Sequence, residues 1–228
     1  MSRPGLPAIL LRLIRRDVAR AYGLGGGDSG QGGFLLPVLF FLTVAILYPF
    51  AVGPDMPLLS RTGGGVIWVA ALLAAILPID RLVLPDRQSG HYDFYAVRGI
   101  SEEWVMAAKI IAHWLSFAPP LLLATIIASA LLGQNSEQLA VLMTGLLLAT
   151  PGLAALAVLI AAIMAGLRSG TALGGLLFLP LAVPMLIFGA GSNVQGGQNG
   201  LMLLAAVSLF LLAISPIAAG AAIRAARD

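Results

Sequence analysis

The chain has 228 residues, of which 59% are hydrophobic and 10% are charged, and its mean hydropathy is +0.97. Soluble domains average about 45–50% apolar and about 25% charged residues, so this composition excludes a soluble protein and indicates an integral membrane protein. The net charge of +3 comes from arginines that we expect to contact anionic membrane lipids, not nucleic acid.

Residues 7–22 are predicted to form an amphipathic helix that lies in the headgroup plane of a membrane. Leu10, Ile14 and Val18 recur every four residues on one face, and arginines recur on another. The residues assigned to the membrane interface are Arg12, Arg15, Arg16 and Arg20. The alternative is a positively charged anchor with no further role. The glycine-rich run 23–33 is predicted to be a flexible joint.

Six apolar stretches follow, each long enough to cross a bilayer core about 30 Å thick. They run over 33–53, 63–79, 108–132, 138–166, 171–190 and 200–222. Twelve of the thirteen Lys and Arg residues can lie on one side of the membrane, and the remaining connections contain only Arg61. Because short basic loops stay in the cytoplasm, we expect both termini inside. The sequence thus predicts an all-α integral membrane protein, with one polytopic domain over 1–228.

Four of the predicted spans contain proline away from their ends: at 119–120, 151, 180 and 184, and 216. Proline lacks the amide donor of a regular helix and therefore frees a carbonyl oxygen one turn earlier. Membrane helices tolerate this when a Ser or Thr side chain or a neighbouring helix satisfies that oxygen. Four kinked helices indicate a bundle with bends or moving parts, and the alternative is that such kinks are simply common in membrane helices.

The connection 80–103 is the most polar segment of the chain and the strongest candidate for a contact with another protein. It mixes charged groups with three aromatic rings, a combination typical of buried protein contacts. The residues assigned to this contact are Asp86, Arg87, Gln88, Ser89, Gly90, His91, Tyr92, Asp93, Phe94 and Tyr95. The alternative is a solvated loop whose arginines only set the topology.

Lys109 and His113 are the ionisable residues nearest to the membrane core, four residues apart on one predicted helix face. One interpretation is a polar pocket in which His113 ligates haem iron. The other is that Lys109 extends its amine to the membrane interface, while His113 and Trp114 form part of an interfacial belt.

No motif for enzymatic chemistry is present. The sequence has no nucleotide-binding loop, no HExxH motif, no paired carboxylates within the spans and no cysteine. The central parts of the spans also lack the ionisable residues that ion-coupled carriers usually place there. We therefore expect no catalytic residue, no metal site and no cofactor bound by this chain, and an energy source on another polypeptide.

Four stretches carry a family resemblance. They are LLRLIRRDVARAY (10–22), LLPVLFFLTVAILYPFAVGPD (35–55), GGVIWVAALLAAILPIDRL (64–82) and AAKIIAHWL (107–115). Together they resemble the cytochrome c maturation protein B family, the membrane subunit of a haem-handling ABC complex, over most of residues 8–222. The sequence departs from the family pattern at 88–94, where an acidic-Gly-Ser/Thr-Leu run followed by Gln-Leu-Leu is usual.

The resemblance extends to ABC-2 type permeases and implies how the polar segments are used. Residues 7–22 would be the interfacial helix, and residues about 86–98 would be a short coupling helix between spans two and three. That helix would dock onto a cytosolic ABC ATPase, which binds the ATP. Haem would be cargo at most. The implied location is the bacterial inner membrane.

The resemblance also implies the function and the other partners. The chain would be the permease subunit in c-type cytochrome biogenesis, and it would use ATP hydrolysis to release a haem-loaded periplasmic chaperone or to export haem. Partners would be a haem-handling membrane protein, a small membrane subunit, the chaperone and a second copy of this chain. Two alternatives stay open: an ABC-2 permease for a polysaccharide, lipid or drug, and a membrane scaffold that transports nothing.

Overall fold

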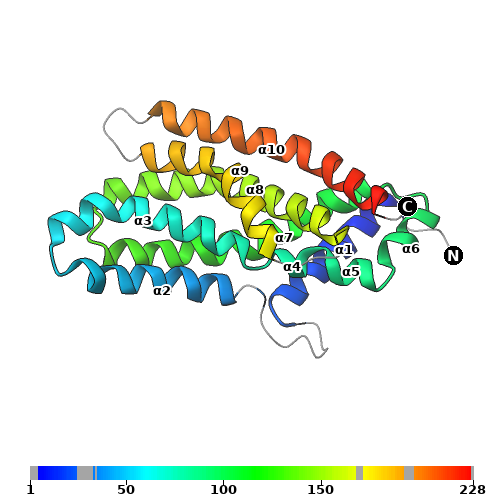
Figure 1. Cartoon of the computed structure of the whole chain (residues 1–228), viewed down its shortest axis with the longest axis horizontal. Helices are drawn as coiled ribbons and strands as arrows, with labels where there is room; N and C mark the ends of the chain where they lie inside the picture. The colour runs from blue at the N-terminus through cyan, green and yellow to red at the C-terminus, as the bar shows by residue number, and fades with distance from the viewer. Residues whose placement is uncertain (1–4, 25–32, 34, 168–171, 193–197, 227–228) are drawn as a thin grey trace.

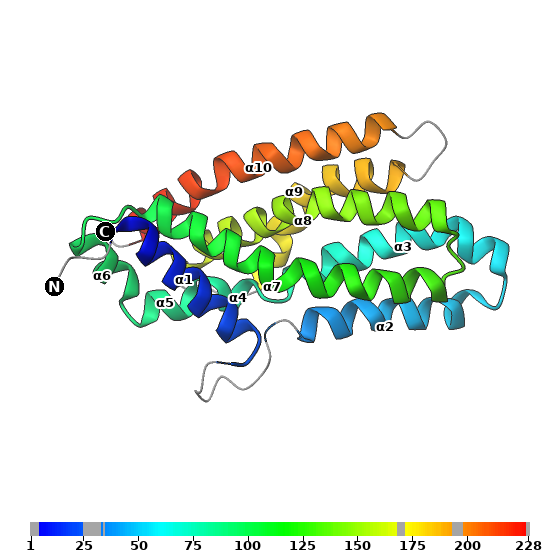
Figure 2. The same ribbon diagram turned by 180° about the vertical axis from the view of Figure 1, so that it is seen from behind.

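The computed structural model describes residues 5–24, 33, 35–167, 172–192 and 198–226. Every regular element within these ranges is an α-helix (Figures 1 and 2). Six of the helices are long and apolar enough to cross a membrane. The prediction of an all-α protein with six membrane-spanning helices is confirmed. The predicted joint at 23–33 lies largely outside the described residues, and so does Arg168 of the fourth connection.

The six long helices form an elongated bundle with two distinct ends. They are α2 (Leu35–Val52), α3 (Met56–Ile76), α7 (Glu102–Leu131), α8 (Ser136–Ala165), α9 (Ala172–Gly191) and α10 (Gln198–Ala225). Both termini lie at one end, which we call the terminal end (Figure 1). The shorter helices also lie there: α1 (Leu6–Ala21), α4 (Ile79–Leu82), α5 (Leu84–Gln88) and α6 (His91–Val97). The α2–α3 and α7–α8 connections lie at the opposite, connection end, together with the end of α9 and the start of α10.

Helix α3 begins at Met56 and not at residue 63, the expected start of the second span. Gly53 has a φ of 92°, which lets the chain turn after α2, and the Asp55 side chain then accepts a hydrogen bond from Leu58 N at 3.1 Å. This N-cap satisfies an amide that the helix itself leaves unpaired. The second span is therefore longer than predicted, and Arg61 belongs to its first two turns.

Helix α8 is the centre of the bundle, because 72% of its most apolar window is buried, compared with 17% for α2 and for α10. It contacts α7, α9, α10, α3 and α4. Small residues such as Ala154, Ala157 and Ala162 are fully buried and allow this close packing. The outer helices α2 and α10 expose large apolar side chains, as helices that face lipid do.

Carbonyl oxygens freed by proline accept a hydrogen bond from a hydroxyl group at two positions. In α8, Pro151 frees the carbonyl of Leu147, and the Thr150 hydroxyl donates to it at 3.5 Å. In α7, Pro119 frees the carbonyl of Leu115, and the hydroxyl of Tyr22 donates to it at 3.4 Å. The second bond comes from just beyond the end of α1, so it also ties α1 to the bundle.

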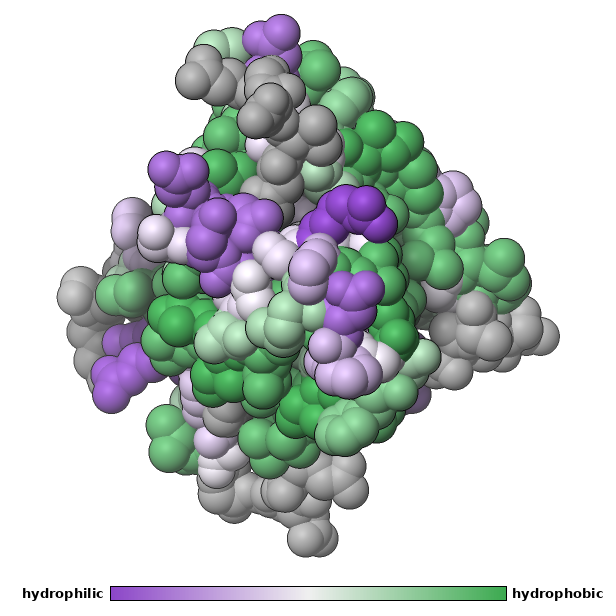
Figure 3. Space-filling model, turned by 90° about the vertical axis from the view of Figure 1, so that its left-hand side faces the viewer, coloured by the Kyte–Doolittle hydropathy of each residue, from purple (hydrophilic) through white to green (hydrophobic). Residues whose placement is uncertain are grey.

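Basic residues are segregated between the two ends. Arg61 lies near the connection end, in the first turns of α3. The other described Lys and Arg residues lie in α1, α4 and α5, just after α6, in the first half of α7 and in the last turn of α10. Figure 3 views the connection end, where hydrophilic residues gather at the centre and hydrophobic residues surround them. The end with most of the described basic residues is also the end at which both termini lie. Because basic residues favour the cytoplasmic side, this end is predicted to face the cytoplasm.

Candidate functional site: a charge cluster and a cavity at the terminal end

The polar connection after the second span forms three short helices, α4, α5 and α6. Gly90 has a φ of 70° and makes the turn between α5 and α6, and Gly99 has a φ of 72° and ends α6. The ten residues assigned to a partner contact do not share one surface. Asp86 and Tyr92 are buried against the bundle, and Asp93 and Phe94 face outward.

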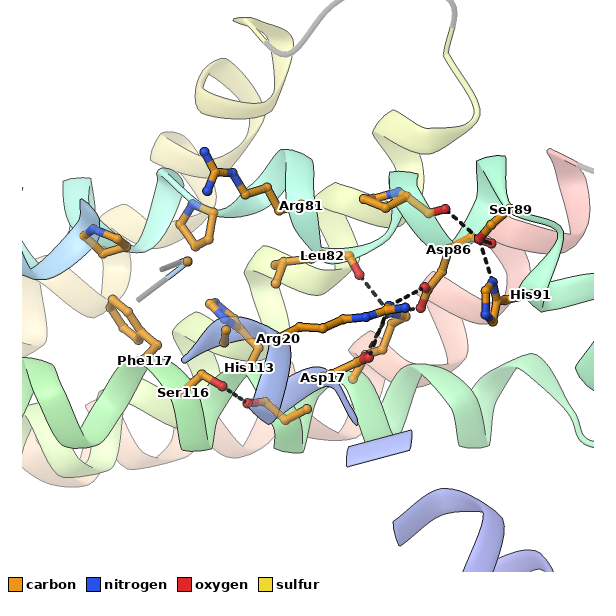
Figure 4. A pocket seen from close by; sticks show the side chains of 17 residues that line it. Asp17, Arg20, Arg81, Leu82, Asp86, Ser89, His91, His113, Ser116 and Phe117 are labelled. Carbon is orange, nitrogen blue, oxygen red and sulfur yellow. Dashed lines mark hydrogen bonds and ion pairs between the residues drawn. The ribbon is translucent and has the colours of Figure 1, made fainter. Parts of the chain in front are cut away.

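Asp86 is the centre of a five-residue charge cluster that joins α1, α5 and α7 (Figure 4). Its carboxylate lies 2.5 Å from Arg16 Nη2, 3.1 Å from Arg20 Nη1 and 2.7 Å from Lys109 Nζ. Lys109 Nζ also donates to the Asp17 carboxylate at 3.1 Å and to the carbonyl of Leu82 at 2.9 Å. All three protons of the ammonium group therefore have an acceptor.

The cluster fixes the charge state of Asp86. Burial on its own would raise the pKa of this carboxyl group, but the nearby Lys109 ammonium and Arg16 guanidinium lower it to about 2. Burial, followed by the negative charges of Asp86 and Asp17, raises the pKa of Tyr92, so this tyrosine stays neutral. Asp86 is therefore a permanent anion that holds three cations at neutral pH.

The structure divides the four arginines that were assigned to the membrane interface. Arg16 and Arg20 turn toward Asp86, whereas Arg12 and Arg15 are exposed. The apolar face of this helix was expected to contact the membrane, but Leu10 and Ile14 pack against the protein core instead. Helix α1 is thus docked on the bundle, and an interfacial role for Arg12 and Arg15 stays a prediction.

Asp17 is a member of the cluster that the sequence interpretation missed. It ion-pairs with Arg16 at 2.7 Å and with Lys109 at 3.1 Å. The sequence contains one indication that Asp17 has a special role: it is the only acidic residue in a helix that contains four arginines. Its partner Lys109 lies 92 positions further along the chain, so local spacing gives no indication of the pair.

Lys109 and Trp114 do not face the membrane interface as one interpretation expected. Lys109 has 5% of its side chain exposed and lies inside the charge cluster. Trp114 turns toward α8, where its Nε1 donates to Thr150 Oγ1 at 3.2 Å. The cause in both cases is a polar partner inside the bundle, which removes the need for a long side chain to reach water.

A cavity of about 830 Å³ adjoins the cluster. Arg20, Asp86 and Lys109 lie along its charged part, and His113 and Phe117 of α7 lie across it from Arg81 of α4 (Figure 4). Lys109 and His113 thus line one cavity, as the polar-pocket interpretation requires. The His113 ring stacks on Phe117 with centroids 5.6 Å apart, and its Nε2 is buried without a hydrogen-bond partner.

The described residues contain no group of three or more potential metal ligands. The haem-ligation interpretation stays an untested prediction.

The outward side of α6, together with Arg98 just after it, includes two residues of the predicted contact segment, Asp93 and Phe94, and extends beyond that segment. Phe94 is 50% exposed and Val97 is 89% exposed. The guanidinium of Arg98 lies 4.1 Å above the Phe94 ring, which holds both side chains in place. We call Asp93, Phe94, Val97 and Arg98 the α6 face.

The fold and the site define a polytopic α-helical membrane protein whose short helices at the terminal end carry a charge cluster and an exposed α6 face. Its sequence identifies the class further. The sequence model of the CcmB protein family matches residues 8–226. The chain belongs to this family.

Two relatives named "Heme exporter protein B" align with almost the whole chain. The protein from Bradyrhizobium diazoefficiens is 40% identical over 96% of this chain and 99% of the relative, and that from Paracoccus denitrificans is 41% identical over 93% and 97%. The protein of the same name from Escherichia coli strain K12 is 35% identical over 82% of this chain and 88% of the relative. The resemblance inferred from the four sequence stretches is confirmed.

Proposed function

We propose that this chain is the permease subunit of an ABC-type complex that handles haem in c-type cytochrome biogenesis. The observation that carries the proposal is membership of the CcmB protein family. Relatives named "Heme exporter protein B" align with this chain over nearly their full length. The six helices that can span a membrane support the role of a membrane subunit.

The α6 face is proposed to dock onto a cytosolic ABC ATPase. Aromatic and arginine side chains contribute most to protein contacts, and Phe94 with Arg98 provides such a pair on an exposed short helix. The terminal end, which carries most of the described basic residues, would then face the cytoplasm of the bacterial inner membrane. Tyr92 is buried and contributes to the fold of the segment instead of to the contact.

The charge cluster is proposed to transmit ATPase motion from the short helices to the spans. Helix α5 is held to α1 and α7 through Asp86, and Arg87 Nη2 donates to the carbonyl of Ala226, just after α10, at 2.5 Å. A displacement of α5 and α6 would therefore pull on α1, α7 and the end of α10 together. Buried ion pairs make a stiff connection, because breaking one leaves a charge without compensation.

The proposed cargo and the remaining partners follow from the family. Haem would be moved, or a haem-loaded periplasmic chaperone released, with ATP bound only by the partner subunit. A haem-handling membrane protein, a small membrane subunit and a second copy of this chain would complete the complex. No cofactor is proposed for this chain itself.

The test compares two exposed phenylalanines at opposite ends of the bundle. Phe94→Ala removes the aromatic ring of the α6 face, and Phe50→Ala removes a ring that is 83% exposed at the end of α2. We expect Phe94→Ala to reduce co-purification of the ATPase about tenfold, as loss of an aromatic contact worth at least about 1.4 kcal/mol would do. Phe50→Ala should leave it unchanged.

Both variants should melt at the temperature of the unchanged protein, because neither side chain is buried. Unchanged ATPase recovery with Phe94→Ala would contradict docking through the α6 face. Equal loss with both variants would show that recovery depends on general membrane assembly and would also contradict it.

A further inference from the structure

The cavity at the terminal end has the composition of a binding site for an amphiphile. One part is charged and includes Arg20, Asp86 and Lys109, and the other part is lined by Pro37, Pro78 and Phe117. Its volume of about 830 Å³ falls within the range of about 300–1,000 Å³ that is usual for small-molecule sites. A ligand with one polar and one apolar end would match both parts.

The charges at the cavity favour an anionic ligand. Three cations (Arg16, Arg20 and Lys109) and two anions (Asp17 and Asp86) leave the cluster with one positive charge. Arg81 lines the same cavity and brings a further guanidinium group, and the neighbouring Asp80 offsets its charge, so the local sum stays at one positive charge. The contacts of Arg20 within the cluster use Nη1, and a guanidinium has five N–H groups, so Arg20 can still donate to a ligand.

His113 gives an independent indication of a ligand. Only 6% of this residue is exposed, and its Nε2 has no hydrogen-bond partner although it lines the cavity. A buried polar atom without a partner is costly, so native proteins rarely keep one without a reason. A polar group of a ligand in the cavity would satisfy this nitrogen.

We propose that this cavity binds an anionic amphiphile that enters from the membrane. Its anionic group lies near Arg20 and Arg81, its apolar part lies against Phe117 and the two prolines, and His113 Nε2 meets a polar atom of the ligand between them. Binding would place the ligand between α1, α4 and α7, the helices around the charge cluster.

Two kinds of molecule carry this chemistry: an anionic phospholipid, and a porphyrin that bears carboxylates. The phospholipid case is independent of the proposed function, whereas the porphyrin case rests on it. The experiment therefore tests each separately, on the full-length chain in detergent, and neither assay uses the ATPase.

The first assay is native mass spectrometry with added phosphatidylglycerol or zwitterionic phosphatidylcholine. The second is a haem titration followed by absorption spectroscopy. The test variants are Arg81→Gln and His113→Phe, and Arg61→Gln is the matched control because it removes one positive charge at the connection end. Melting of each variant is measured first, so that loss of the fold is recognised.

We expect phosphatidylglycerol to bind in preference to phosphatidylcholine, with affinity about tenfold lower in Arg81→Gln and unchanged in Arg61→Gln, since a charge-assisted hydrogen bond is lost only in the former. If haem is the ligand, it should displace phosphatidylglycerol, and its absorption band should shift in a manner that His113→Phe abolishes. Equal binding of the two lipids together with no haem binding would overturn the proposal. Equal effects of Arg81→Gln and Arg61→Gln would overturn it as well.

Discussion

Replacement of Asp86 by Asn tests whether the charge cluster holds the terminal end together. Asn has nearly the same size but cannot ionise, so Lys109, which is 5% exposed, loses its nearest anion at 2.7 Å. The fall in the pKa of Asp86 from 3.8 to about 2 corresponds to about 2 kcal/mol of stabilisation at neutral pH. Removing one partner of a buried ion pair typically costs about 3–5 kcal/mol of stability, and we take this range as the upper limit for Asp86→Asn.

The direction of the pH effect is fixed by the sign of the shift. The folded protein holds the Asp86 carboxyl at a lower pKa than the unfolded chain does, so it binds fewer protons between those two values. The stabilisation is therefore fully present above about pH 4 and is lost as the pH falls through about 2. The difference between the unchanged protein and Asp86→Asn should shrink over that window.

The assay is unfolding in mixed detergent micelles, followed by tryptophan fluorescence at pH 7 and at pH 3. Glu137→Gln is the matched control, because Glu137 is an exposed acid in the first turn of α8 at the connection end. Its cost should stay within about 0.5 kcal/mol. The double variant Asp86→Asn/Lys109→Met should lose less stability than the sum of the two single variants. In the double variant the buried Lys109 ammonium is absent, so it does not have to remain without the Asp86 carboxylate. An Asp86→Asn cost equal to that of Glu137→Gln would refute the reasoning.

Two further substitutions test the packing of the spans, each by the melting temperature in detergent. Gly189→Ala would place a methyl group 2.4 Å from the buried ring of Trp68, and we expect a loss of about 1–3 kcal/mol. Gly191→Ala in the same helix meets no atom of the described residues within 4 Å and should be neutral; equal effects would contradict the close approach. Thr150→Val removes the hydroxyl that bonds across to α7, and it should cost about 1–3 kcal/mol. Thr144→Val removes an exposed hydroxyl of α8 and should cost less; the reverse order would contradict the assignment.

The spans were predictable because hydrophobicity acts on whole segments and does not depend on which helices are neighbours. The start of α3 was not, because a cap at Asp55 and the turn at Gly53 extend the helix through a polar stretch that includes Arg61. Hydropathy places the start of the span after Arg61, because a charged residue lowers the local hydropathy. The helix itself begins at the position where its first amide groups find a hydrogen-bond acceptor.

The charge cluster could be predicted only in part, because its members come from three helices far apart in the sequence. Arg16, Arg20, Asp86 and Lys109 were each singled out, but for separate roles at a membrane interface, at a partner surface and in a pocket. Position 86 lies 70 residues from Arg16, so the pairing depends on how α1 packs on α7. Residue type identified the polar groups, and tertiary packing decided which of them meet.

The same limit applies to the aromatic residues of α6. Tyr92 and Phe94 are two positions apart and look equivalent in the sequence, yet Tyr92 is 4% exposed and Phe94 is 50% exposed. On a helix, residues two apart point in different directions, and only the placement of the helix against the bundle decides which one is buried.

The central claim is that this chain works as the membrane subunit of an ATP-driven haem-handling complex. The most direct measurement is purification of the tagged chain in mild detergent after expression with its genomic neighbours, followed by mass spectrometry and a haem absorption spectrum. We expect an ABC ATPase and a haem-containing membrane protein to co-purify with it. Recovery of the ATPase without haem or a haem protein would contradict the haem function, and failure to recover any ATPase would contradict the ABC subunit role itself.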